Sequence, residues 1–343
     1  MAIFTDVFED VTKQGRKIPT SDYHETGIYP IIDQGQSEIA GYTDEADGLF
    51  TDVPAIVFGD HTRVLKYVNT PCFLGADGVK LLKARIPNPN YKYLYYALSS
   101  ADIPNTGYNR HFKWLKEVNI PLPDADEQQK IVDALDKVSE LIALRKEQLA
   151  KLDQLVKSRF IELFGDPITN SNNLPTERME LRFNLKAGIT TAADDIHEFE
   201  EGMYEIPCYG GNGIRGYVRE KSYTGNYPII GRQGALCGNV QYATGEFHAT
   251  EHAVLVSLLK NDNSVWVYHL LKLMDLYRYH TGAAQPGLAV KTLNTIEVIV
   301  ADKRKQDQFA AFVEQTDKSK LAIQQSLDKL ETLKKSLMQE YFG

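Results

Sequence analysis

Apolar residues recur at steps of three and four positions along the segment 124–165, a spacing that places them on one face of a helix. Asp124 and Glu127 have the spacing of a capping box, and Gly165 followed by Pro167 is typical of a helix end. The pattern predicts one helix of roughly 55 Å, at a rise of about 1.5 Å per residue. Its apolar stripe, interrupted by Arg145 and Arg159, consists of Ile131, Leu135, Val138, Ile142, Leu149, Leu152, Val156 and Leu163.

The segment 302–343 repeats this design. Its stripe, interrupted by Thr316, Lys320 and Lys334, consists of Phe309, Val313, Ile323, Leu327, Leu330, Leu337 and Tyr341. A sustained seven-residue repeat is typical of a left-handed coiled coil, and two narrow stripes in one chain most simply pack on each other. The alternative is that each helix packs on a globular domain of its own.

The segments before the two helices have a different pattern. They mix short β-like apolar runs with frequent glycine, asparagine, proline and tyrosine, and each contains one short helical stretch, near 91–100 and 265–278. This combination predicts strand-rich α/β domains of the α+β kind with many polar loops. The predicted organisation is a first globular domain over 1–123, a helix over 124–165, a second globular domain over 166–301 and a helix over 302–343.

The chain also resembles itself at a long interval, which indicates a duplication. Pro54 aligns with Pro228 at a shift of 174 positions, and the run that begins at Gly75 aligns with the run that begins at Ala249 at the same shift. The other aligned positions are Asp124, Gln128 and Gly165 with Asp302, Gln306 and Gly343, at a shift of 178, and residues 29–42 with 206–217. We therefore expect each domain and its helix to form one copy of a duplicated unit.

Residues 211–216 match G-x-G-x-x-G, the glycine spacing of a dinucleotide-binding loop. That motif requires a helix after its last glycine, whereas the residues from Tyr217 onward are aromatic, partly alternating and soon interrupted by Gly225. The aligned copy, 29–42, lacks the motif. Because glycine adopts positive φ angles without strain, a hairpin turn is the better interpretation.

Two further motifs suggest enzymes. His248, Glu251 and His252 fit H-x-x-E-H, in which two histidines one helical turn apart bind zinc and the glutamate activates water. The aligned residues 74–78 contain no histidine, and the residues after His252 are compatible with a strand. Residues 88–91, Asn-Pro-Asn-Tyr, depart from the N-P-P-Y loop of amino-methyltransferases, and a turn before a helix is simpler. We predict no catalytic residues and no metal site, with a stand-alone zinc-dependent hydrolase as an alternative.

Composition limits the class of protein. The three cysteines lie far apart, which indicates neither a disulfide framework nor a cysteine zinc site. The sequence starts with an acidic stretch and contains no apolar run of the roughly 20 residues that span a bilayer, so we expect a cytoplasmic protein without membrane association. The 38 basic and 46 acidic residues give a net charge of −8, which argues against indiscriminate coating of nucleic acid but is compatible with a local basic cleft.

Polar loops of both domains carry side chains of the kind that read DNA bases. The stretch 108–114 interleaves cations, amides and aromatic rings, and the stretch 231–239 places polar side chains among glycines. Arginine pairs with guanine, and asparagine or glutamine with adenine, in the major groove, while lysine holds phosphates. The alternative is that these are solvated loops. The predicted DNA-contacting residues are Gln34, Gln36, Arg63, Asn109, Arg110, Lys113, Asn212, Arg215, Arg232, Gln233, Asn239 and Gln285.

Residues 119–167 combine a helix start, N-I-P-L-P-D-A-D-E-Q-Q-K-I, with a helix end, F-I-E-L-F-G-D-P. They resemble the central conserved helix of the specificity subunits of type I restriction-modification systems. The resemblance extends over the whole chain as domain, helix, domain, helix. The second copy matches more loosely, with Lys305 in place of Glu127.

This resemblance implies two target recognition domains, each reading one half of a split site in double-stranded DNA, and no chemistry in this chain. It implies an antiparallel coiled coil that gives the molecule an approximate two-fold axis and sets the spacing of the half-sites. It also implies two methyltransferase subunits that bind S-adenosylmethionine and methylate adenines, and in some systems restriction subunits that use ATP and magnesium, in phage defence. It does not identify the bases read. A coiled-coil scaffold without DNA readout is the remaining alternative.

Overall fold

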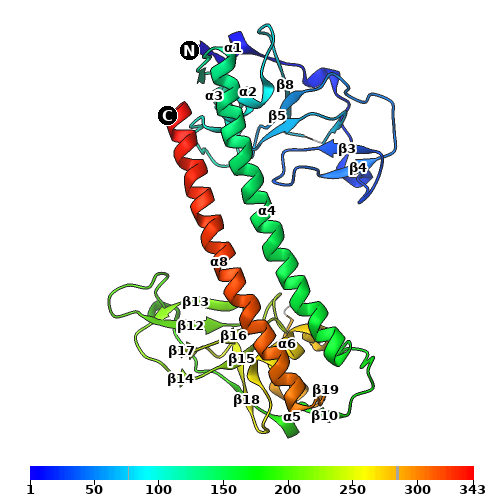
Figure 1. Cartoon of the computed structure of the whole chain (residues 1–343), viewed down its shortest axis with the longest axis vertical. Helices are drawn as coiled ribbons and strands as arrows, with labels where there is room; N and C mark the ends of the chain where they lie inside the picture. The colour runs from blue at the N-terminus through cyan, green and yellow to red at the C-terminus, as the bar shows by residue number, and fades with distance from the viewer. Residues whose placement is uncertain (76, 283–285) are drawn as a thin grey trace. The chain divides into compact units, whose positions relative to one another are not determined.

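The computed structural model describes residues 1–75, 77–282 and 286–343, and Figure 1 shows their arrangement within each part of the chain. The chain divides into two compact units, Met1–Arg145 with Ser326–Gly343, and Lys146–Gln325. Each unit contains one strand-rich domain and parts of the two long helices, α4 (Ala125–Phe164) and α8 (Lys303–Phe342). Across the described residues, no helix has the length and apolar character that crossing a membrane requires.

The first domain is built from three small sheets. The four-stranded sheet has the order β2-β8-β5-β6 and is antiparallel, whereas the sheet of order β4-β3-β7 includes one parallel pair, β3 with β7; β1 pairs with β9. The strands are β1 (Ala2–Ile3), β2 (Phe8–Asp10), β3 (Tyr29–Ile32), β4 (Gly41–Thr43), β5 (Ala55–Gly59), β6 (Leu65–Val68), β7 (Phe73–Leu74), β8 (Val79–Ala84) and β9 (Asn119–Ile120). The short helices are α1 (Phe4–Val7), η1 (Thr12–Gln14), η2 (Thr20–Asp22), α2 (Tyr91–Ser99) and α3 (Phe112–Leu115).

The second domain also has three sheets, of order β11-β18-β15-β16, β13-β12-β17-β14 and β10-β19. Here the parallel pair is β12 with β17. The strands are β10 (Thr176–Arg178), β11 (Phe183–Ala187), β12 (Ile206–Gly210), β13 (Gly213–Val218), β14 (Tyr223–Thr224), β15 (Tyr227–Gly231), β16 (Val240–Ala243), β17 (Glu246–Ala249), β18 (Ala253–Leu258) and β19 (Glu297–Ile299). The short helices are α5 (Met179–Arg182), η3 (Ala193–Asp195), α6 (Ser264–Leu273), η4 (Leu276–Tyr279) and α7 (Val290–Asn294).

The two domains share one topology, with β14 as an addition among the described strands of the second. The predicted duplication is thus confirmed, but one of its alignments was wrong. The central strands β5 and β15 end at Gly59 and Gly231, which gives a shift of 172 rather than 174. The two prolines are not equivalent positions, because Pro54 precedes β5 whereas Pro228 lies inside β15.

The glycine-rich stretch 211–216 belongs to a hairpin, as predicted. Strands β12 and β13 pair antiparallel up to Gly210 and Gly213, which leaves Gly211 and Asn212 as the tip. Gly213 has a φ of +100°, a backbone conformation that is strained for residues with a side chain. The predicted helical stretches correspond to α2 and α6, and the side chain of Asn90 caps α2 by accepting from the N–H of Tyr93, so residues 88–91 are the expected turn before a helix.

Helices α4 and α8 pack against each other in both units. In the second unit, the ring of Phe309 lies 5.3 Å from that of Phe160 and 5.9 Å from that of Phe164, measured between centroids. In the first unit, α8 packs near its end against the cluster that contains Ile131 of α4. The start of α4 thus meets the end of α8 and the reverse, which makes the pair antiparallel. All stripe residues predicted from the sequence are buried or half-buried.

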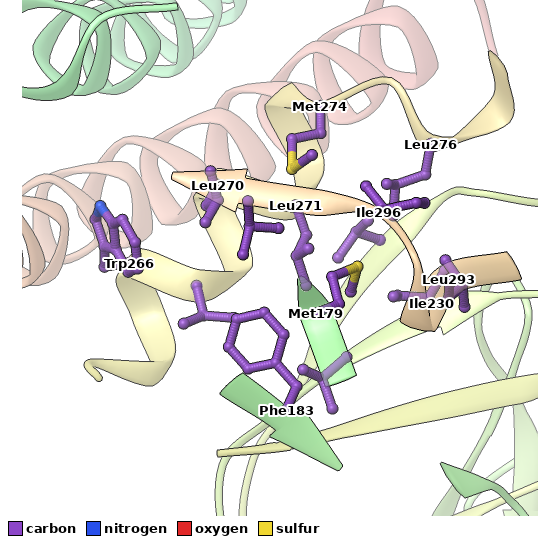
Figure 2. Packing of buried hydrophobic residues seen from close by; sticks show 14 of the residues in the cluster. Met179, Phe183, Ile230, Trp266, Leu270, Leu271, Met274, Leu276, Leu293 and Ile296 are labelled. Carbon is purple, nitrogen blue, oxygen red and sulfur yellow. The ribbon is translucent and has the colours of Figure 1, made fainter. Parts of the chain in front are cut away.

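The helices also contribute side chains to the domain cores. The two helices therefore pack on each other and on the globular domains, so both arrangements considered from the sequence occur. Figure 2 shows the core of the second domain, where Phe183, Trp266 and Leu270 lie among other apolar side chains. Phe160 and Phe164 of α4 belong to the same cluster and are 0% and 1% exposed. The sequence stripe omitted both phenylalanines because they face the domain as well as α8.

Candidate nucleic-acid interface

Four loops of the first domain meet at one edge, which we call its loop edge: 33–40 after β3, 60–64 after β5, the turn before β8 that ends at Gly78, and 100–111 after α2. Asp60 joins three of them through its backbone. Its N–H donates to the carbonyl of Gly78 at 2.6 Å, and its carbonyl accepts from the N–H of His111 at 2.8 Å. The fourth loop joins through Gln34, whose side-chain oxygen accepts from the N–H of His61 at 3.3 Å.

The second domain has a loop edge made of the corresponding segments: 211–212 between β12 and β13, 232–239 after β15, 250–252 between β17 and β18, and 286–289 before α7. The N–H of Arg232 donates to the carbonyl of His252 at 3.0 Å, and its carbonyl accepts from the N–H of Leu288 at 2.8 Å. The amide of Asn239 donates to the side-chain oxygen of Asn212 at 2.6 Å. Asn212, Arg232 and Asn239 were all predicted, and the structure brings them into one cluster.

Asp60 and Arg232 occupy the same place in the two copies. Each follows the last glycine of the central strand, and each makes the same two backbone hydrogen bonds. Their side chains have opposite charges and different surroundings. Asp60 is 4% exposed and its carboxylate accepts from the N–H of Phe112 at 2.7 Å, whereas Arg232 is half-buried and its Nε has no hydrogen-bond partner among the described residues. The same backbone arrangement, which we call the backbone frame, therefore carries a buried carboxylate in the first domain and a half-buried guanidinium in the second.

A second pair of equivalent positions also differs. Lys66 of β6 lies opposite Val57, and Gln241 of β16 lies opposite Ile229, so both occupy the same place beside the central strand. The Lys66 side chain is 2% exposed, and its ammonium donates to the carboxylate of Asp33 at 3.3 Å and to the carbonyl of Ser37 at 2.5 Å. This buried lysine fixes the loop after β3, which is longer than the hairpin tip that replaces it in the second domain.

Glycine permits the close approach of the hairpin tip to the end of β15. A Cβ added to Gly231 would lie 2.1 Å from the carbonyl oxygen of Gly211, and one added to Gly211 would lie 3.2 Å from the carbonyl oxygen of His252. Side chains at Gly231 would therefore push the tip away from Arg232. The glycines of this region serve the packing of the loop edge and not a phosphate loop.

The predicted residues of the first domain divide into two groups. Gln36, Asn109, Arg110 and Lys113 are exposed. Gln34 and Arg63 are half-buried and hold loops together, since the guanidinium of Arg63 donates to the carbonyl of Ile103 at 2.9 Å. Lys113 lies over the ring of Trp114, 4.9 Å from its centroid. The exposed group has side chains available for a partner, and the assignment of all six to DNA stays a prediction.

In the second domain, Asn212, Arg215 and Gln233 are exposed, while Arg232 and Asn239 are half-buried. Arg215 projects from β13 and its side chain lies over Gly210, beside the hairpin tip. Gln233 forms a backbone bridge with Gly287, which ties the loop after β15 to the segment before α7. Gln285 lies outside the described residues.

The predicted DNA-contacting residues omit several residues of the loop edges, although Tyr108 belongs to the stretch 108–114 that was singled out from the sequence. The ring of His61 stacks on that of Tyr108, with centroids 4.6 Å apart and an angle of 9° between the planes, and Tyr108 is 86% exposed. Thr250 and His252 lie in the turn between β17 and β18, which binds Arg232 through the carbonyl of His252. Their Oγ1 and Nδ1 atoms are buried without a hydrogen-bond partner in the described structure. Their position directly after a strand end was the only available signal.

The H-x-x-E-H residues do not have the geometry of the zinc motif. His248 lies on β17, and Glu251 and His252 lie in the turn before β18, so the two histidines are not one helical turn apart. The Nε2 of His248 lies 2.8 Å from the hydroxyl of Thr191, and burial lowers the pKa of this histidine. The described residues contain no group of three or more His, Cys, Asp or Glu arranged to hold a metal ion.

The three cysteines are free and buried, as expected of a chain without a disulfide framework. Burial raises the pKa of the Cys72 and Cys208 thiols to about 11, so both stay protonated at neutral pH. Protonated buried thiols are poor nucleophiles and poor metal ligands. They contribute to packing.

Comparison with known proteins identifies the family. The model of the type I restriction modification DNA specificity domain matches the chain twice, over residues 4–154 and 183–334. The chain belongs to this family. Each matched region contains one complete loop edge together with much of the long helix that follows it.

Two curated specificity subunits from Escherichia coli are similar to this chain. The EcoprrI subunit is 39% identical over 213 residues, which cover 57% of this chain and 51% of that subunit. The EcoR124I/EcoR124II subunit is 30% identical over 139 residues, which cover 37% of this chain and 34% of that subunit. The chain thus spans about half the length of the first of these relatives and about a third of the second.

Solved structures share the fold. The S subunit of a type I restriction-modification system from M. genitalium superposes with a TM-score of 0.65 at 19% identity, covering 99% of this chain and 95% of that one. A chain from a study of complex assembly and conformational transition of the type I R-M system gives a TM-score of 0.54 at 14% identity, with the same coverage. These matches confirm the predicted fold class, two strand-rich domains with two long paired helices.

Proposed function

We propose that this chain is the DNA-specificity subunit of a type I restriction-modification complex, in which each globular domain reads one half of a bipartite site. The observation that supports this proposal most directly is the pair of loop edges. One backbone frame is built twice and carries different side chains in its two copies, as at Asp60 and Arg232. Such a frame suits the reading of two different half-sites.

The exposed chemistry of both loop edges fits base reading. Guanidinium groups and side-chain amides are the donors and acceptors that distinguish base pairs in the major groove. Asn109 and Arg110 supply them in the first domain, and Asn212 and Gln233 supply them in the second. The net charge of −8 leaves much of the phosphate contact to partner subunits.

In this proposal the chain performs no reaction itself. Two methyltransferase subunits that bind S-adenosylmethionine dock on the paired helices α4 and α8 and methylate adenines. Restriction subunits that use ATP and magnesium join where the system includes them. The helices set the number of unread base pairs between the half-sites, and the complex acts on double-stranded DNA in the cytoplasm, in defence against phage.

The test is to express the chain with the methyltransferase subunits of its system and to map methylated adenines by single-molecule sequencing. The double variant Arg232→Ala with Gln233→Ala should relax one half of the methylated motif, because it removes two readers of the second domain. The matched variant Asn109→Ala with Arg110→Ala should relax the other half. Effects of both variants on the same half, or on neither, would contradict the proposal, provided that melting temperatures show both variants to be folded.

A further inference from the structure

Unpartnered buried polar atoms are concentrated at the loop edge of the second domain. Arg232 Nε, Thr250 Oγ1 and His252 Nδ1 are buried there without a hydrogen-bond partner in the described part of the chain. The other such side-chain atoms, Trp114 Nε1, Ser139 Oγ and Trp266 Nε1, are scattered over three other elements. Because buried polar groups are normally satisfied, a cluster of exceptions calls for a partner from outside the chain.

Arg232 is held in place at its backbone. Its N–H and carbonyl both form hydrogen bonds, to His252 and from Leu288, and the glycine before it packs against the hairpin tip. Its side chain is half-buried, and its backbone nitrogen lies beside the hairpin tip, 3.8 Å from the position of a Cβ added to Gly211. The side chain of Arg232 therefore projects from a backbone position that hydrogen bonds hold in place on the loop edge.

The charge of Arg232 has no counterion in the described structure. The carboxylate of Glu251, in the turn before β18, is engaged elsewhere, since one oxygen lies 3.3 Å from Nε2 of His252 and the other accepts from the N–H of Thr191 at 3.3 Å. The Nε of this guanidinium is shielded from water without an acceptor in the described structure, which costs free energy, while the side chain as a whole remains partly exposed. An external group with two adjacent acceptors would supply what the chain does not.

We propose that Arg232 is the guanine-reading residue of the second domain, with its guanidinium donating to the O6 and N7 atoms of one guanine in the major groove. This inference rests on the proposed function above. Guanine presents two neighbouring acceptors in the major groove, which match the fixed fork of arginine. The exposed amides of Gln233 and Asn212 stand on the same edge, where adjoining bases would lie.

The first domain supplies an internal contrast. Asp60 holds the equivalent position but is 4% exposed, and its carboxylate accepts from the N–H of Phe112 within the fold. Asp60 is thus a structural residue, and the first domain reads its half-site from its exposed residues instead. Two copies of one frame consequently read different bases with residues at different positions.

The experiment compares the methylation motifs given by wild type, Arg232→Gln, Arg232→Ala and Arg219→Gln, each in the complex with its methyltransferase subunits. Arg219 follows β13, at the opposite end of that strand from the hairpin tip, and its guanidinium stacks on Tyr204, which makes it the matched control. The half-site assigned to the second domain should contain an invariant guanine. Both Arg232 variants should lose at least about fivefold of the preference for that guanine and keep the other positions, since a good bidentate pair contributes about 1–3 kcal/mol of discrimination. Arg219→Gln should keep the wild-type motif.

Three results would overturn the inference. A wild-type half-site without an invariant guanine leaves Arg232 nothing to read. Uniform weakening at all sites, with a reduced salt dependence of DNA binding, would identify Arg232 as a phosphate contact. An unchanged motif in both Arg232 variants would remove it from recognition, while the proposed function itself would still stand if the wild type gives a bipartite motif.

Discussion

Replacing Asp262 with alanine should destabilise the second unit by about 3 kcal/mol. The side chains of Asp262 and Arg182 are 2% and 9% exposed. One guanidinium nitrogen of Arg182 lies 2.5 and 2.6 Å from the two carboxylate oxygens, and Nε donates to the carboxylate at 3.1 Å. Gln306 of α8 also donates to this carboxylate, at 2.9 Å, and accepts from the N–H of Asn263 at 2.8 Å. The ion pair therefore joins α5, the start of α6 and α8.

The magnitude follows from what the substitution leaves behind. Breaking a buried ion pair by removing one partner costs about 3–5 kcal/mol, because the remaining charge is buried and unpaired. Arg182 retains Glu177 at 3.3 Å, a carboxylate that is 41% exposed and compensates only in part, so we expect the lower end of this range. For a unit of this size, about 2–4 °C of melting temperature corresponds to 1 kcal/mol, which predicts a decrease of roughly 6–12 °C.

The assay is urea and thermal denaturation of the whole chain, followed by circular dichroism. The matched control is the double variant Arg182→Met with Asp262→Leu, which removes both charges and should lose much less stability than the single variant. The first domain supports this expectation, because Val7 and Pro89 stand at the equivalent places at the end of α1 and before the cap of α2. A single variant within about 1 kcal/mol of wild type, or a double variant as unstable as the single one, would refute the reasoning.

Two further predictions concern His269 and the long helices. Burial, aided by Lys272 and Lys320, lowers the pKa of His269 to about 3, so the folded state keeps this ring neutral while the unfolded chain takes up a proton below about pH 6.5. As the pH falls below about 6, the free energy of unfolding of the wild type should therefore decrease by about 1.4 kcal/mol per pH unit more than that of His269→Phe. A difference in stability between the two proteins that does not change with pH would contradict this. Deleting one heptad from α4 and the facing heptad from α8 removes about 10 Å of helix and should shorten the gap of the methylated motif by about three base pairs; an unchanged gap would contradict the role of the helices as a spacer.

The long helices could be predicted because their signals are local. Asp124 at the start, Gly165 at the end and the apolar stripe between them specify α4 without reference to the rest of the chain, and the structure caps α4 through the carboxylate of Asp124, which accepts from the N–H of Glu127 at 2.9 Å. Phe160 and Phe164 could not be assigned in the same way. Their contacts with Trp266 depend on the packing of the second domain against the helix, which periodicity does not encode.

The loop edges could be predicted only in part, for the same reason. Residue type and neighbouring glycines led to the prediction of Arg232, Asn239 and Asn212, but the hydrogen bond between the two asparagines depends on the pairing of strands far apart in the sequence. The equivalence of Asp60 and Arg232 required the strand register, since the sequence alignment was displaced by two positions at β5. Side chains at strand ends are informative about a site only after the strands have been placed.

The measurement that tests the central claim most directly is a genome-wide map of methylated adenines in cells that express this chain with its methyltransferase subunits, compared with cells that express those subunits alone. The account predicts a bipartite motif that appears only with the chain, with two specified halves and a gap of constant length between them. A continuous motif, a motif that is the same without the chain, or the absence of methylation from a complex that assembles would contradict it.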